Sequence, residues 1–166
     1  NTWLLLPDAK EIMNDNDYDM LSLLKPKLIE LEEKIIPKKN MKYFGLGWYK
    51  SSSFWSDGFK SSILFSKKQG EILRSIEIEC EIFNFSELTK PNFKFNLNNK
   101  LIEQITYEKN NNLHTIKIDI PENYSKFDEY TLDIINLNKK TRLDLRIAPD
   151  PRLLGLKILS IKFIGS

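Results

Sequence analysis

Aromatic and small polar residues are crowded together in one short part of the chain, residues 43–59. Seven aromatic side chains fall within these 17 positions, interleaved with Gly, Ser and Asp. A Trp or Tyr ring stacks on the apolar face of a sugar, while Asp, Asn, Ser or Lys hydrogen-bonds to the hydroxyls around it. We therefore predict a carbohydrate site here, with contacts from Trp48, Tyr49, Trp55 and Asp57.

The same aromatic residues have a purely structural interpretation, which the sequence leaves open. Trp48 and Trp55 could fill one end of the core, and each would then bury about 200 Å². Trp55 lies in a Ser-rich polar segment, so it is the better candidate for a ligand platform.

A second group of functional side chains precedes the last apolar segment of the chain. Asp150 and Arg152 stand directly before a run that begins at Leu153 and continues to Ile161. Arg152 is a candidate ligand-binding residue, because a guanidinium recognises carboxylates, phosphates and hydroxyl groups. The alternative is an ion pair between Arg152 and Asp150 that fixes the loop.

Residues suited to catalysis or to metal binding are few. His114 shares a strand face with apolar residues, and Cys80 lies on an apolar face, so both are predicted to be structural. The row Glu77, Glu79, Glu81 is predicted to face solvent, because side chains about 6–7 Å apart on one face do not surround an ion. Nucleotide-binding, serine-hydrolase and zinc-protease motifs are absent from the sequence. We predict no catalytic residue, no metal and no cofactor.

Size and charge narrow the classes of protein further. The chain has 166 residues, a mass of 19.5 kDa and a net charge of +2, which argues against a nucleic-acid-binding protein. One Cys excludes an internal disulfide framework. No apolar run approaches the roughly 20 residues of a transmembrane helix.

Residues 1–40 are predicted to form a helical linker or docking segment. Asp8 can cap a first helix, and Leu28, Leu31 and Ile35 have the three- and four-residue spacing of an amphipathic helix that ends at Pro37. Such a helix would dock a neighbouring catalytic domain or mediate homo-oligomer formation.

From residue 41 the apolar pattern changes to a period of two, which predicts β-strands. Turn signals separate the segments at intervals of about ten residues; among them, Asn98-Asn99 is predicted to form a hairpin turn and Asn110–Asn112 a further turn. This spacing is typical of an antiparallel β-sandwich or jelly roll of about eight or nine strands, here over residues 41–166. The last segment is mostly apolar, so we expect it to be central. The expected strands are Lys42–Tyr49, Ser61–Ser66, Ile76–Ile82, Phe93–Leu97, Leu101–Glu108, Ile116–Ile120, Thr131–Leu137, Leu143–Ile147 and Leu156–Ile164.

Three motifs carry a resemblance to a known family. They are Gly47-Trp48, Trp55-Ser56-Asp57-Gly58, and the closing run from Asp150 through Ile161. In order and spacing they resemble an accessory β-sandwich domain of bacterial glycosyltransferases and related proteins of capsule and lipopolysaccharide synthesis. The resemblance covers roughly residues 41–166 and departs from the family at Lys50–Ser53, where an acidic loop with Pro or Gly is expected. It implies a jelly-roll-like module beside a catalytic domain, without catalysis by the module itself.

The sequence therefore favours a non-catalytic glycan-binding or scaffolding module of a larger, cytoplasmic protein of surface-polysaccharide biosynthesis. Two alternatives remain: a structural module for protein interaction or oligomerisation without a sugar site, and a small sugar-active enzyme. The enzyme would need a pocket with two convergent acidic side chains or with His114.

Overall fold

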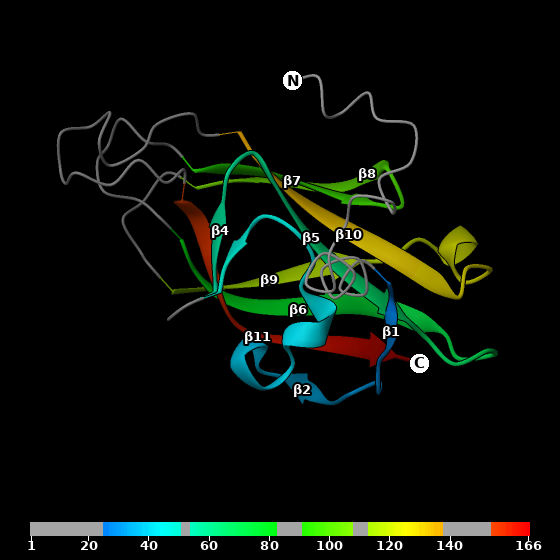
Figure 1. Ribbon diagram of the computed structural model, residues 1–166. Coiled ribbons are helices and arrows are strands. Elements are labelled where there is room, and N and C mark those ends of the chain that lie inside the picture. The colour runs from blue at the N-terminus through cyan, green and yellow to red at the C-terminus, as the bar shows by residue number, and fades with distance from the viewer. Residues whose placement is uncertain (1–24, 51–53, 83–90, 108–112, 138–153) are drawn as a thin grey trace, which may run out of the picture.

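Two β-sheets that face each other make up the computed structural model, which describes residues 25–50, 54–82, 91–107, 113–137 and 154–166 (Figure 1). One sheet has five strands, in the spatial order β1 (Lys27–Leu28), β5 (Lys60–Ser66), β10 (Glu129–Asn136), β7 (Asn92–Leu97) and β8 (Lys100–Thr106). The other has the order β3 (Trp48–Tyr49), β4 (Trp55–Asp57), β11 (Leu154–Gly165), β6 (Leu73–Ile82) and β9 (Leu113–Asp119), and β2 (Lys34–Ile35) also pairs with β11. All pairs are antiparallel except β1 with β5.

The predicted mainly-β class with two antiparallel-rich sheets is confirmed. Alternation of apolar and polar residues decides which side chains face inward: in β7, Phe93, Phe95 and Leu97 are buried while the residues between them are partly exposed. Across the core, the rings of Phe65 and Phe163 join the two sheets at a centroid distance of 4.4 Å. Within the described residues, no helix is long and apolar enough to cross a membrane.

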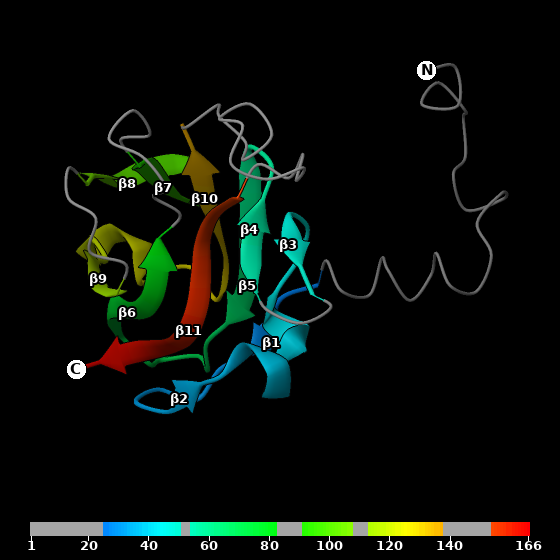
Figure 2. The same ribbon diagram turned by 90° about the vertical axis from the view of Figure 1, so that its left-hand side faces the viewer.

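The last strand is central, as its apolar sequence predicts. β11 pairs with β6 along one side and with β4 and β2 along the other (Figure 2). Both edges of β11 are paired and its inner face packs on the opposite sheet, which explains why few of its residues are polar. Lys157 and Lys162 are its charged residues, and both are only partly exposed.

The predicted helix over residues 28–36 is wrong. The segment forms β1 and β2, which join different sheets, and Glu32 has a φ of +68° in the turn between them. Ile29 is buried at 1% exposure whereas neighbouring Leu28 is 48% exposed, so Leu28 does not lie on the buried face that the helical spacing predicts for it. Pairing with strand edges far away in the sequence therefore overrides the local three- and four-residue spacing. The predicted helical residues before Lys25 lie outside the described residues.

The details of several predicted strands also change. The described residues contain eleven strands, more than the predicted eight or nine. Of the predicted strand Lys42–Tyr49, only Trp48–Tyr49 form a named strand, β3, and Phe44 forms an isolated bridge with Ile63. The segment before Phe44, η4 (Met41–Tyr43), is a 3-10 turn, as is η3 (Pro37–Lys39). A further 3-10 turn, η5 (Glu122–Tyr124), lies in the loop before β10. The predicted strand Leu143–Ile147 and the predicted turn at Asn110–Asn112 lie in ranges that the structure does not describe.

The predicted Asn-Asn hairpin turn between β7 and β8 is confirmed. Asn98 and Asn99 both have positive φ angles, of 48° and 68°, as a two-residue hairpin turn of this kind requires. The side-chain oxygen of Asn98 accepts a hydrogen bond from the Thr131 backbone N–H at 2.8 Å, which fixes the turn against β10.

Candidate functional site

The β3–β4 hairpin at the edge of the six-stranded sheet presents different residues on its two faces. Trp48 lies opposite Ser56, and Tyr49 lies opposite Trp55. Residues directly opposite each other in an antiparallel pair share a face, and successive residues alternate between faces. Ser56 is buried at 1% exposure, so Trp48 and Ser56 face the interior. Tyr49 and Trp55 therefore form a pair on the outer face, where both are partly exposed.

Trp48 is fixed at the margin of the core. Its indole N–H donates a hydrogen bond to the Ser62 carbonyl at 2.9 Å, and its ring meets that of Phe44 edge-on at a centroid distance of 5.2 Å. Trp48 packs against the buried core cluster, whereas Trp55 is not part of that cluster. The structure therefore places the two Trp residues in different environments, with Trp48 against the core and Trp55 on the opposite face of the hairpin.

A row of polar residues continues from the aromatic pair across the sheet. Lys157 of β11 lies opposite Trp55 on one side and opposite Glu81 of β6 on the other. Asp57, two residues after Trp55, shares its outer face and is also partly exposed. Adjacent strands are about 4.8 Å apart, so the row Tyr49, Trp55, Lys157 extends over about 10 Å.

A shallow hollow lies next to this row, in the gap that β4 and β2 leave along the edge of β11. It has a volume of about 170 Å³, and Lys38, Phe54 and Lys157 are among the residues that line it. Ile36, 39% exposed, and Leu159, partly exposed, add apolar surface to the hollow. Aromatic rings, two ammonium groups, a carboxylate and an apolar wall thus lie within one region of the surface.

Close backbone contacts hold the hairpin in this position. Gly47 has a φ of +87°, and a Cβ atom there would lie 2.1 Å from the Lys60 carbonyl oxygen. The Gly47 carbonyl accepts hydrogen bonds from the Ser61 hydroxyl at 2.6 Å and from the Asp57 backbone N–H at 2.8 Å. Only glycine combines this backbone angle with so close an approach. The glycine of the Gly47-Trp48 motif therefore positions the hairpin.

The closing motif has the same kind of structural role. A Cβ atom on buried Gly155 would lie 2.6 Å from the Ser56 hydroxyl oxygen and 2.9 Å from the ring of Phe93. That hydroxyl accepts a hydrogen bond from the Leu156 backbone N–H at 2.9 Å. Ser56 and Gly155 together bind β4 tightly to β11, which in turn fixes Trp55 beside Lys157.

Lys50, which begins the segment that departs from the family resemblance, turns back onto the domain. Its ammonium group donates to the Phe44 carbonyl at 2.8 Å, and burial lowers the pKa of this group below its ordinary value. Lys50 therefore supports the same part of the hairpin as Trp48. The residues that follow it, 51–53, lie outside the description.

The other candidate residues lie away from the hairpin or beyond the described ranges. Asp150 and Arg152 are not among the described residues, so their contribution stays a prediction. Cys80 is fully buried, and burial, together with the nearby Glu81 carboxylate, raises the pKa of its thiol to about 12. His114 lies opposite Cys80, and its ring contacts Tyr107 at a centroid distance of 4.1 Å.

The acidic residues of β6, Glu77, Glu79 and Glu81, lie next to lysines of neighbouring strands. Glu77 lies opposite Lys162 and Lys117, and Glu79 forms an ion pair with Lys34 at 3.5 Å. Among the described residues, no group of three His, Cys, Asp or Glu side chains could hold a metal ion. Charge pairing across strands is the role that the structure gives to this row.

Sequence reasoning missed Lys157 and Lys38 as members of the candidate site. Lys157 had a signal: it is a charged residue between Leu156 and Ile158 in an otherwise apolar strand, which marks it as facing outward. Lys38 gave no such signal, because it comes near the hairpin only through the pairing of β2 with β11.

Among known proteins, this chain is similar in fold to several solved structures. No protein-family model matches the chain, and no curated protein matches it in sequence. An acetyl xylan esterase from the rumen bacterium Butyrivibrio proteoclasticus aligns at 11% identity with a TM-score of 0.46, over 83% of this chain and 31% of that one. A CBM6 carbohydrate-binding module from Clostridium stercorarium, solved with cellobiose, aligns at 9% identity with a TM-score of 0.47, over 86% and 98% of the two chains.

A family 35 carbohydrate-binding module from an environmental isolate aligns at 17% identity with a TM-score of 0.44, over 80% of this chain and 82% of that one. Identities this low transfer no ligand-contacting residue from these proteins to this chain, since one fold hosts many functions.

Proposed function

We propose that this chain is a non-catalytic glycan-binding module whose platform is the outer face of the β3–β4 hairpin. The observation that carries the proposal is the cross-strand pair of Tyr49 and Trp55, which are partly exposed on the face away from the core. Lys157 and Asp57 flank the pair and supply the donor and the acceptor that sugar hydroxyls require. Trp48 supports the platform from the inner face.

The platform suits a sugar with flat apolar faces. A β-linked glucose unit carries its hydroxyls around the rim of the ring, which leaves C–H faces that stack on an aromatic side chain. An outer sheet face accommodates a chain of such units better than a closed cavity does. We therefore expect oligosaccharides to bind more tightly than single sugars.

A fluorescence titration tests the proposal. Cellobiose, maltose and glucose are added to the intact protein while tryptophan emission is followed. We expect cellobiose to change the emission, and Trp55→Ala or Tyr49→Ala to raise the dissociation constant about tenfold, the effect of losing about 1–1.5 kcal/mol of aromatic stacking.

Phe127→Ala is the matched control, because Phe127 is an aromatic residue 38% exposed outside the hairpin. Unchanged affinity in this variant is expected. If cellobiose and the other sugars leave the emission and the amide spectrum unchanged at high concentration, the platform is not a sugar site.

The wider setting of the module is also part of the proposal. We place it in the cytoplasm, beside a catalytic domain of a larger glycosyltransferase-type protein of bacterial surface-polysaccharide biosynthesis. The support is the ordered set of motifs at Gly47-Trp48, Trp55–Gly58 and Asp150–Ile161. Determination of the full-length gene product and its neighbouring domain tests this placement; an unrelated neighbour would overturn it.

A further inference from the structure

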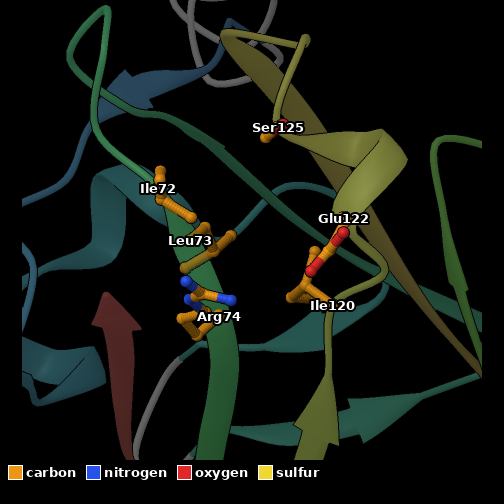
Figure 3. Close-up of a pocket in the computed structure, with 6 residues that line it drawn as sticks. All are labelled: Ile72, Leu73, Arg74, Ile120, Glu122 and Ser125. Carbon is orange, nitrogen blue, oxygen red and sulfur yellow. The ribbon is translucent and has the colours of Figure 1, made fainter. Parts of the chain in front are cut away.

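A second hollow lies in a separate part of the domain, between the start of β6 and the segment that follows β9 (Figure 3). Its volume is about 310 Å³, which is at the lower end of the range for small-molecule sites. Leu73 and Ile120, 3% and 8% exposed, form an apolar floor, and Ile72, 42% exposed, forms part of the rim. A hollow of this volume has room for a small molecule with a single ring.

Two opposite charges face this hollow from its two sides. Arg74 reaches in from β6, and Glu122 lies across from it on η5 (Figure 3). Within the part of the chain that the structure describes, neither side chain has an ion-pair or hydrogen-bond partner. The hydroxyl of Ser125 adds a third polar group to the lining.

The loop that carries Glu122 and Ser125 is held in place by hydrogen bonding to the side chain of Tyr130. The buried Tyr130 hydroxyl lies 2.8 Å from the Tyr124 carbonyl oxygen and 2.7 Å from the Phe127 carbonyl oxygen, and these two acceptors share its one hydrogen. On the opposite side, the Ile120 backbone N–H donates to the Arg74 carbonyl at 2.9 Å. The two walls of the hollow are therefore held at a set distance, as a preformed binding site requires.

The polar groups define what a ligand must offer. A guanidinium is a donor only, and it binds a carboxylate most strongly, by two parallel hydrogen bonds. A carboxylate is an acceptor only, so Glu122 requires hydroxyl or ammonium donors and disfavours an anion without them. The apolar floor matches the C–H face of a ring. We propose that this hollow binds a small hydroxylated carboxylic acid, of the class of the uronic acids.

An amide NMR titration tests this proposal, with D-glucuronate as the probe and D-glucose, acetate and alanine as comparisons. We expect glucuronate to bind more tightly than each of the others. The largest shifts should fall on the amides of Arg74, Ile120, Glu122 and Ser125. Glucose lacks the carboxylate, acetate lacks the donors, and alanine lacks the ring.

Two substitutions separate the contributions of the charges. Arg74→Gln should raise the glucuronate dissociation constant about tenfold or more, as the loss of hydrogen bonds to a charged group implies. Glu122→Gln should narrow the preference for glucuronate over acetate, because the repulsion of a bare anion is removed. The matched controls Lys117→Gln and Glu129→Gln make the same charge changes at exposed positions elsewhere and should leave binding unchanged.

The result distinguishes this site from the hairpin platform. Trp55→Ala should leave the glucuronate titration unchanged, whatever its effect on cellobiose. The proposal is overturned if glucuronate binds no better than glucose, acetate or alanine. It is also overturned if the shifts fall outside the hollow, or if Arg74→Gln, with an otherwise native amide spectrum, binds glucuronate as tightly as the unsubstituted protein.

Discussion

Gly47 and Gly58 flank the candidate platform and have almost the same backbone angle, so they allow a controlled test of how the hairpin is held. Their φ values are +87° and +96°. A Cβ atom at Gly58 would meet nothing within 4 Å, whereas one at Gly47 would lie 2.1 Å from the Lys60 carbonyl oxygen and 2.7 Å from the Ser61 Cα. Alanine at either position suffers the strain of positive φ, but only Gly47→Ala also collides with backbone atoms.

The expected cost differs accordingly. Positive φ costs alanine roughly 1–2 kcal/mol, and the lower entropy of the unfolded chain offsets about 0.4–1 kcal/mol of this. Gly58→Ala should therefore lower the free energy of unfolding by about 1 kcal/mol. Gly47→Ala adds an overpacking cost of about 1–3 kcal/mol, because a backbone carbonyl cannot rotate away as a side chain can.

Thermal and urea unfolding of the two variants measure the difference. We expect Gly47→Ala to be about 2 kcal/mol less stable than Gly58→Ala, which corresponds to about 4–8 °C in melting temperature for a domain of this size. Gly70→Ala, with a φ of +88° and no atom within 4 Å, is a second control and should match Gly58→Ala. Equal stabilities of all three variants would refute the close approach of Gly47 to β5.

Three further predictions concern buried ionisable and hydroxyl groups. Burial raises the pKa of Cys80, Tyr107 and Tyr130 to about 12, so their contribution to stability is complete below their ordinary pKa values and is lost as pH rises from about 9 toward 12. The urea midpoint should therefore fall between about pH 8 and about pH 11, and the native Cys80 thiol should resist alkylation until the protein unfolds. Tyr130→Phe should lower the free energy of unfolding by about 1–2 kcal/mol in urea titrations, because the Tyr124 and Phe127 carbonyls lose their donor; an unchanged midpoint would contradict this role.

The sequence predicted the strands best where one long strand buries one face. In β7 and over Ile76–Ile82 of β6 the apolar residues alternate without interruption, so the period of two is the signal of the strand itself. The sequence-based prediction failed for Lys27–Ile35, because β1 and β2 have only two residues each and are strands only through their pairing with β5 and β11. A two-residue strand has no measurable period, and the accidental spacing of Leu28, Leu31 and Ile35 then resembles a helix.

For the candidate site as well, the sequence shows which residues are close along the chain but not which residues strand pairing brings together. The sequence showed the crowding of aromatic residues, and its Ser-rich segment favoured Trp55 as a platform. It did not show the hairpin register that places Tyr49 beside Trp55 on the outer face. The second hollow gave no sequence signal, because Arg74 and Glu122 belong to segments that only the sheet pairing of β6 with β9 brings together.

The register of the β3–β4 hairpin places Trp48 and Trp55 on opposite faces, so substitutions of the two residues test different properties of the protein. Trp48 has its N–H bonded to Ser62 and its ring against Phe44, so its removal takes away packing and a hydrogen bond of the fold. A loss of sugar binding in a Trp48 variant would therefore not show that its ring contacts a ligand. Trp55 lies on the opposite face and outside the core cluster, so its removal leaves those interactions intact. The affinity of Trp55 variants, at unchanged stability, is thus the measurement that separates a glycan-binding module from a sandwich that merely carries surface aromatic residues.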